Sequence, residues 1–244
     1  MQGTERFRYL DALTTAFVVV LLVSNLLAQK VIMFGPWGHL GSHRIGPFET
    51  SGAMVLFPLT YIFGDIFTEV YGYSASRRAI WMGFCGTAVL YGISAIVIAL
   101  PYDPSWKNQQ AFIEVFGILP RVLASSLVAF WAGEFANSFT MAKLKLLTKG
   151  KHLWTRTVGS TVVGQAVDTT LVVSLMFAGK LPAHTIALII VEGYCFKVIY
   201  EVVATPLTYL VVNALKRAEG VDAFDSHTDF NPFKFAEKKK DRTA

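Results

Sequence analysis

Six apolar runs of about 20 residues or more alternate with polar segments along most of the chain. A helix of about 20 residues is long enough to cross the hydrocarbon core of a bilayer. Only 16% of the 244 residues are charged, whereas a soluble domain carries about 25%. The sequence therefore predicts an all-α, polytopic membrane protein with six transmembrane helices, placed at roughly 11–33, 50–73, 78–100, 120–142, 157–179 and 184–214.

Two of the connecting segments have a predicted structure of their own. Residues 34–47, between the first two runs, are dense in Gly and Pro and indicate a tight turn or a small hairpin. Residues 111–117, between the third and fourth runs, have the pattern of a short amphipathic helix on the membrane surface.

The distribution of basic residues predicts the orientation in the membrane. If the N-terminus is cytoplasmic, 16 of the 22 Lys and Arg residues lie on that side and 5 on the other, with Lys197 inside the sixth run. Positive residues concentrate in cytoplasmic loops, so both termini are predicted to be cytoplasmic. We divide the chain into a transmembrane domain, 1–215, and a polar cytoplasmic tail, 216–244, which we expect to be partly disordered.

Two carboxylates interrupt the second apolar run. Tyr61, Asp65 and Glu69 recur every four residues, so on a helix they share one face. An ionisable side chain at the bilayer centre costs about 2.5–3.5 kcal/mol on insertion scales, so such residues point into a bundle or a wet cavity, where they usually handle a solute or an ion.

Polar side chains also recur at helical spacing in the other runs, except the third. Because these faces would meet at the bundle axis, and because they mix hydrogen-bond donors and acceptors, they predict a binding site for a polar solute. The predicted site residues are Asn25, Tyr61, Asp65, Glu69, Glu134, Asn137, Gln165, Asp168, Lys197 and Glu201.

Structural roles compete with this interpretation. Lys197 and Glu201 are four residues apart on one helix and are expected to neutralise each other, although Lys197 has an acid of a neighbouring helix as its other candidate partner. Pro206 should kink the sixth helix near Glu201. The histidines and the two cysteines lack any spacing typical of metal ligands, so no metal or cofactor is predicted.

The two halves of the chain show a weak internal sequence similarity. Residues 24–30 resemble 136–143, and residues 64–68 resemble 164–169. With three runs in each half, a true repeat would be a 3+3 inverted repeat and would place the site near mid-membrane. Chance explains this similarity equally well.

Four strings give a family resemblance. Residues 57–73, 133–145, 154–168 and 219–225 resemble the queuosine precursor transporter family, within the vitamin uptake transporter group. The resemblance implies a non-enzymatic transporter of the bacterial inner membrane that imports 7-cyano-7-deazaguanine and 7-aminomethyl-7-deazaguanine for queuosine salvage in tRNA. The implied partners are the small molecule and the lipid bilayer, without nucleic acid, and a homodimer is left open.

The polar residues suit that cargo. A guanine-like edge offers N1–H and an amine, which a carboxylate accepts in a two-point arrangement, so Asp65 or Asp168 is expected to bind this edge. Tyr61 is expected to stack on the base. The remaining recognition is assigned to the amides of Asn25, Asn137 and Gln165. 

One acid is given a different role. Glu69 or Glu134 is expected to carry a coupling proton or to balance the aminomethyl cation.

Two rival functions remain. A substrate-binding membrane subunit of an energy-coupling vitamin importer is suggested by the small-residue pattern of Ala12 and Ala16. An intramembrane aspartyl protease would use Asp65 and Asp168 as its dyad, but the segment ending at Asp65 lacks the first glycine of a G-x-G-D motif. No phosphate-binding loop is present, so the chain does not itself hydrolyse ATP.

Overall fold

The computed structural model describes residues 7–34, 38–40, 43–45, 48–117 and 120–234, and it is mostly helical, as predicted. Its helices are α1 (Leu10–Leu27), α2 (Phe57–Ile66), α3 (Tyr73–Ala99), α4 (Gln109–Phe116), α5 (Pro120–Leu147), α6 (Leu153–Phe177) and α7 (Ala183–Glu219). Its shorter elements are β1 (Val31–Phe34), β2 (Gly38–Leu40), β3 (His43–Ile45), β4 (Phe48–Ser51), the 3₁₀ turn η1 (Gly52–Val55) and the π-helical turn η2 (Phe67–Tyr71).

Four stretches of the described chain are long and apolar enough to cross a membrane: Leu10–Leu27, Tyr73–Ala99, Gln109–Leu147 and Leu153–Phe177. They correspond to the first, third, fourth and fifth predicted runs. The second and sixth runs correspond to α2 and α7, which do not meet the same measure of length and composition. α2 has only 10 residues before it passes into η2.

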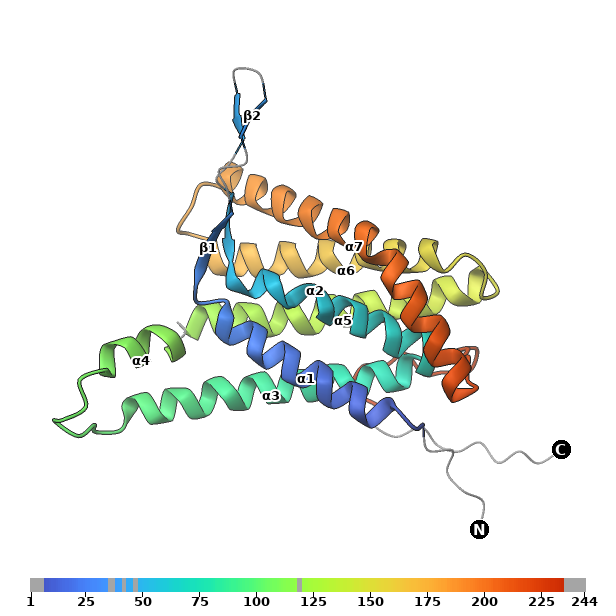
Figure 1. The fold of residues 1–244 in the computed structure, drawn as a ribbon, viewed down its shortest axis with the longest axis horizontal. Coiled ribbons are helices and arrows are strands. Elements are labelled where there is room, and N and C mark those ends of the chain that lie inside the picture. Colours follow the sequence, from blue (N-terminus) through green and yellow to red (C-terminus); the bar gives the residue numbers. More distant parts are fainter. Residues whose placement is uncertain (1–6, 35–37, 41–42, 46–47, 118–119, 235–244) are drawn as a thin grey trace, which may run out of the picture.

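The first two predicted runs are shorter as helices than their apolar lengths suggested. α1 ends at Leu27, and β1 pairs antiparallel with β4, so that Val31 lies opposite Ser51. β2 pairs antiparallel with β3 in a second two-stranded sheet, which lies beyond the end of the bundle (Figure 1). The β-branched and aromatic residues at the ends of these runs favour strands over helix. The pairing of β2 with β3 confirms the predicted hairpin for the described part of residues 34–47, whereas 35–37, 41–42 and 46–47 lie outside it. α4 confirms the short helix near 111–117.

α2 occupies the centre of the bundle, where it contacts α1, α5 and α7 (Figure 1). α3 packs on α1 and α5, while α6 packs on α5 and α7. This arrangement gives the polar face of α2 neighbours from both halves of the chain and keeps it away from lipid.

Two glycines allow α5 and α6 to approach closely. A Cβ atom at Gly133 would lie 2.6 Å from the Cβ of Asp168, and one at Gly164 would lie 2.7 Å from the Cβ of Asn137. Small residues of this kind bring helix backbones together in membrane proteins. The same crossing holds Asn137 and Asp168 at the interface between the two helices.

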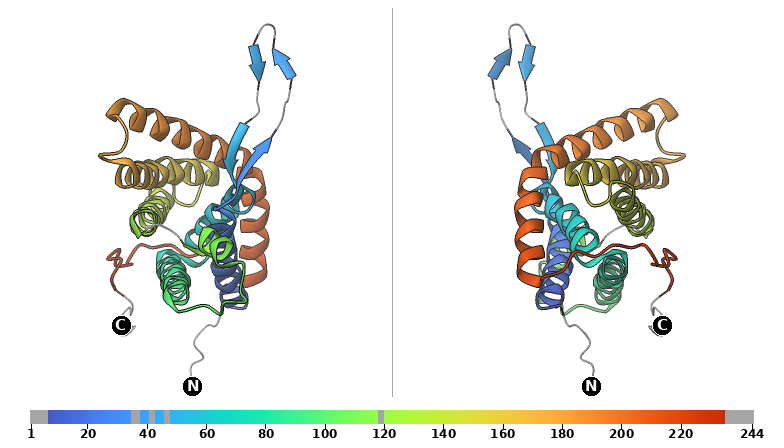
Figure 2. Two further views of the ribbon diagram at one scale, coloured as in Figure 1. Left: turned by 90° about the vertical axis from the view of Figure 1, so that its left-hand side faces the viewer. Right: turned by 90° about the vertical axis from the view of Figure 1, so that its right-hand side faces the viewer.

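α7 is sharply bent (Figure 2). Pro206 lies inside the helix, where it removes one backbone hydrogen bond and its ring crowds the carbonyl of Val202. The predicted kink is therefore confirmed, and it follows the buried Glu201.

The chain after α7 lies along α3. Both carboxylate oxygens of Asp225 accept from the backbone N–H of Tyr73, at 3.2 and 3.1 Å, at the first residue of α3. Arg77 donates to the carbonyls of Asp229 and Asn231. The sequence predicts a partly disordered tail, but as far as Lys234 the tail has these defined contacts. They form because α3 presents the free backbone N–H at its first residue and the guanidinium of Arg77. Residues 235–244 lie outside the described chain, and the division at 215 stays a prediction.

The start of α1 and the end of α7 are joined. The Glu219 carboxylate accepts from the backbone N–H groups of Arg8 and Tyr9, at 2.9 and 2.7 Å, and from the hydroxyl of Tyr71, at 2.9 Å. The first and last helices therefore have these two ends at the same end of the bundle.

Candidate functional site

A cavity of about 170 Å³ lies inside the bundle, between α1, α3, α5, α6 and α7. An engineered cavity of about 150 Å³ accommodates benzene, so this pocket has room for an aromatic ring. Its lining is apolar with a few polar groups, as is usual for small-molecule sites. The lining residues are Leu21, Asn25, Thr87, Tyr91, Leu123, Ser126, Leu127, Phe130, Asp168, Val172 and Lys197.

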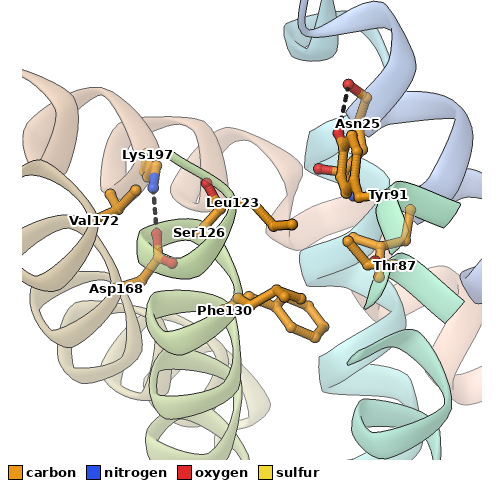
Figure 3. Close-up of a pocket in the computed structure, with 11 residues that line it drawn as sticks. Asn25, Thr87, Tyr91, Leu123, Ser126, Phe130, Asp168, Val172 and Lys197 are labelled. Atoms are coloured by element: carbon orange, nitrogen blue, oxygen red, sulfur yellow. Dashed lines mark hydrogen bonds and ion pairs between the residues drawn. The ribbon is translucent and has the colours of Figure 1, made fainter. Parts of the chain in front are cut away.

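The polar groups occupy two sides of this pocket. Figure 3 shows Asp168 and Lys197 together on one side, with Asn25 and Tyr91 across from them. Lys197 Nζ donates to Asp168 Oδ2 at 2.6 Å, and the Tyr91 hydroxyl donates to the Asn25 carbonyl at 3.3 Å. The Phe130 ring lies between the two sides. The pocket thus offers a carboxylate, an ammonium group and aromatic surface to one guest.

The predicted pairing of Lys197 with Glu201 is wrong. Lys197 reaches across to α6, where it bonds Asp168 and, at 3.2 Å, the hydroxyl of Thr169. This is the interhelical alternative that the sequence left open. Glu201 is fully buried, and neither of its carboxylate oxygens has a hydrogen-bond partner within the part of the chain that the structure describes.

Three carboxyl groups from three helices gather beside the pocket without lining it. Asp65 of α2, Glu134 of α5 and Glu201 of α7 form what we call the buried acid cluster, and each is more than nine-tenths buried. The Asp65 carboxyl interacts electrostatically with Glu201 and Glu134. The side-chain amide of Asn137 donates to Asp65 Oδ1 at 3.3 Å, which places Asn137 on the same cluster.

The remaining predicted site residues occupy two different environments. Tyr61 and Gln165 are buried beside the acid cluster: Tyr61 interacts electrostatically with Asp168, Glu134 and Glu201. Glu69, in contrast, lies in an ion network at the end of the bundle where α1 begins. Sequence spacing placed Asp65 and Glu69 on one face, but only Asp65 belongs to the acid cluster.

Three cations surround the Glu69 carboxylate. Arg156 donates from Nε at 3.1 Å and from Nη2 at 2.8 Å, and Lys216 donates from Nζ at 2.6 Å. Lys145 donates to the Glu69 carbonyl at 2.6 Å and lies 3.4 Å from its carboxylate. Glu69, Arg156 and Lys145 are almost completely buried. Glu69 therefore joins η2 to α5, α6 and α7.

Asp222 completes this network from the chain after α7. Its carboxylate accepts from Lys145 and Lys216. Partial burial raises the pKa of Asp222, but the hydrogen bonds from the two lysines outweigh burial and hold the pKa below its usual value.

The sequence did not predict several residues of the pocket and of the ion network around Glu69. Thr87 and Tyr91 of α3 line the pocket, although the sequence predicts no polar face for the third run. Their spacing of four residues was the available signal. Arg156 and Lys145 lie in the polar segment between the fourth and fifth apolar runs, and nothing in their local sequence indicates burial.

Within the described part of the chain, no group of three or more His, Cys, Asp or Glu side chains is arranged to hold a metal ion.

Apolar helices around a pocket that holds a few polar groups, with charged side chains directed inward, are typical of a multi-pass membrane transporter. The chain belongs to the family described as "Putative vitamin uptake transporter", whose profile matches residues 51–211. A Bacillus subtilis (strain 168) protein named "Probable queuosine precursor transporter" is 28% identical over 188 residues, covering 76% of this chain and 77% of the relative. No solved structure matches. The chain is a transporter and not an enzyme.

Proposed function

We propose that this protein imports the queuosine precursors 7-cyano-7-deazaguanine and 7-aminomethyl-7-deazaguanine. Family membership and the name of the Bacillus subtilis relative support a transporter of this kind. The observation that carries the proposal is the pocket in which Asp168 and Lys197 face aromatic surface inside the bundle.

The proposed recognition follows from the chemistry of the lining. Asp168 accepts hydrogen bonds from N1–H and the exocyclic amine of the base, while Lys197 donates to its carbonyl oxygen. Phe130 and Tyr91 supply stacking surface, and Asn25 serves the opposite edge. A bicyclic base is larger than one aromatic ring, so the pocket must widen when the substrate binds.

This proposal redistributes the predicted substrate-binding residues. Asn25, Asp168 and Lys197 line the pocket and are assigned to the substrate. Glu69 is assigned to the ion network, because Arg156 and Lys216 occupy its carboxylate. The residues assigned to the surroundings of the pocket are Tyr61, Asp65, Glu134, Asn137, Gln165 and Glu201.

We also propose that six helices cross the bacterial inner membrane with both termini in the cytoplasm. The shared position of the start of α1 and the end of α7 supports termini on one side. The excess of Lys and Arg at that end supports its cytoplasmic location. The 3+3 inverted repeat and a homodimer stay predictions.

The rival function as a subunit of an energy-coupling importer requires an ATPase partner. Purified protein in liposomes should exchange labelled precursor without any partner, which a subunit that depends on an ATPase would not do. 

The decisive test is queuosine in tRNA of a strain that cannot make its precursors and lacks its own importer. At limiting external precursor, expression of this chain should restore queuosine, and a variant with Asp168→Asn should not. An exposed control, Glu192→Gln, should restore it as well as the wild type. Unchanged queuosine with the wild-type chain present at normal levels in the membrane would overturn the proposed function.

A further inference from the structure

The buried acid cluster contains more carboxyl groups than the pocket needs. Asp65, Glu134 and Glu201 do not line the cavity, and no ion pair joins any of them to a cation among the residues that the structure describes. Lys197 acts on Glu134 electrostatically, but its ammonium is bonded to Asp168. A buried carboxylate without a bonded counter-charge is strongly unfavourable.

Several buried acceptor oxygens in this region have no hydrogen-bond partner among the residues that the structure describes. They are Asp65 Oδ2, Glu134 Oε2, Asn137 Oδ1, Gln165 Oε1 and both carboxylate oxygens of Glu201. Asn137 and Gln165 are also more than nine-tenths buried. Buried acceptor oxygens need a hydrogen to be satisfied. Protons bound to the carboxyl groups supply it and remove the uncompensated charge at the same time.

Two of the three acids lie next to irregular points in their helices. Asp65 is two residues before the π-helical turn η2, and Glu201 precedes the Pro206 bend in α7. π-turns and proline kinks interrupt the regular hydrogen-bond ladder and are common where helices move or act. A change of charge at Asp65 or Glu201 would therefore act on segments that bend more readily than a straight helix.

We propose that the buried acid cluster carries a proton and couples precursor import to proton entry, with Glu201 as its main carrier. This inference rests on the proposed function. A proton binds the Glu201 carboxylate when the cluster opens outward and leaves from the same oxygen when it opens inward, so that one proton and one substrate move in the same direction. The other groups that interact with the cluster from the surrounding elements are Tyr61, Glu69, Asp168 and Lys197.

The test uses the full chain in liposomes with labelled 7-cyano-7-deazaguanine, which is uncharged, and a pH-sensitive dye inside. With one proton per substrate, an inward gradient of one pH unit should drive about tenfold accumulation. A protonophore should abolish the accumulation, and adding substrate should acidify the interior. Exchange of labelled for unlabelled precursor without a gradient measures binding and folding in the same preparation.

The Glu201→Gln variant should keep exchange but lose both gradient-driven accumulation and substrate-dependent acidification, and Asp65→Asn should weaken both. The matched control, Glu192→Gln on the exposed surface of the same helix, should behave as the wild type. Wild-type uptake that does not respond to the pH gradient overturns the inference. A Glu201→Gln variant that accumulates the labelled precursor normally, or that loses exchange as well, also overturns it. Failure of the proposed function has a different result: the wild type shows no exchange at all.

Discussion

The Arg156 guanidinium donates two hydrogen bonds to the Glu69 carboxylate, 3.1 Å from Nε to Oε2 and 2.8 Å from Nη2 to Oε1. Both side chains are almost completely buried. Two-point geometry of this kind is the strongest form of an arginine–carboxylate pair. Because Glu69 lies in the π-helical turn η2, the pair fixes the irregular end of α2 against α6.

Removing one partner of this pair should be strongly destabilising. Arg156→Ala leaves the Glu69 charge buried with only its lysine partners, and the expected loss is about 3–5 kcal/mol of unfolding free energy. Arg156→Lys should lie between the wild type and Arg156→Ala because a lysine lacks the planar fork. Denaturant unfolding in detergent measures these changes. Arg78→Ala, at an exposed position of α3, should stay within about 0.5 kcal/mol of the wild type.

The close crossing of α5 and α6 gives a second prediction. Leucine at position 133 would collide with Asp168, and leucine at position 164 with Asn137. Each of Gly133→Leu and Gly164→Leu should therefore destabilise the protein by at least about 1–3 kcal/mol, the usual cost of overpacking. Size-exclusion profiles and melting temperatures in detergent would report it. Gly92→Leu enters open space and should have no such effect; equal melting temperatures for all three variants would contradict the assigned crossing.

The helices were predictable because they follow from local pattern. Long apolar runs predict most of the α-helices, Gly and Pro predict the hairpin after α1, and Pro206 predicts the bend in α7. The ends of the helices were less predictable, since the apolar residues Val31 to Phe34 are compatible with a strand as well as with a helix. Apolar length sets an upper limit on a helix, whereas strand pairing with a distant segment decides where it stops.

The partners inside the bundle were not predictable in the same way. Helical spacing showed that Lys197 faces inward, but it could not show that Asp168 of α6 lies closer to its ammonium than Glu201. Lys145 and Arg156 lie in polar sequence that normally faces water. Their distant partners explain their burial: Glu69 for both, and Asp222 for Lys145 as well. Contacts between segments far apart in the chain depend on how helices pack, which spacing along one helix does not contain.

The lowered pKa of Asp222 predicts a dependence of stability on pH. Its folded-state pKa lies below the value of an unfolded aspartate, about 3.9. Its contribution is therefore complete above that unfolded value and is lost as the pH falls through the folded value. Asp222→Asn should lower the melting temperature modestly at pH 7, because the side chain is 46% exposed, and the difference from the wild type should vanish in acid. Glu114→Gln, an exposed change on α4, should match the wild type at both pH values.

The pair in the pocket gives the last prediction. If Asp168 accepts two donors from the base, Asp168→Asn should raise the KM for precursor about 10- to 100-fold, which is the expected loss for hydrogen bonds to a charged group. The same variant also leaves Lys197 without its 2.6 Å partner, so the double variant Asp168→Asn with Lys197→Met separates the two causes. Lys197→Met also removes a group assigned to the substrate, so a defect that persists or grows in the double variant supports binding by Asp168. Full recovery of uptake would show that the carboxylate only neutralises the lysine. An analogue without the exocyclic amine sharpens the result: the wild type should reject it at least tenfold, whereas Asp168→Asn should hardly discriminate, because the acceptor that reads the amine is gone.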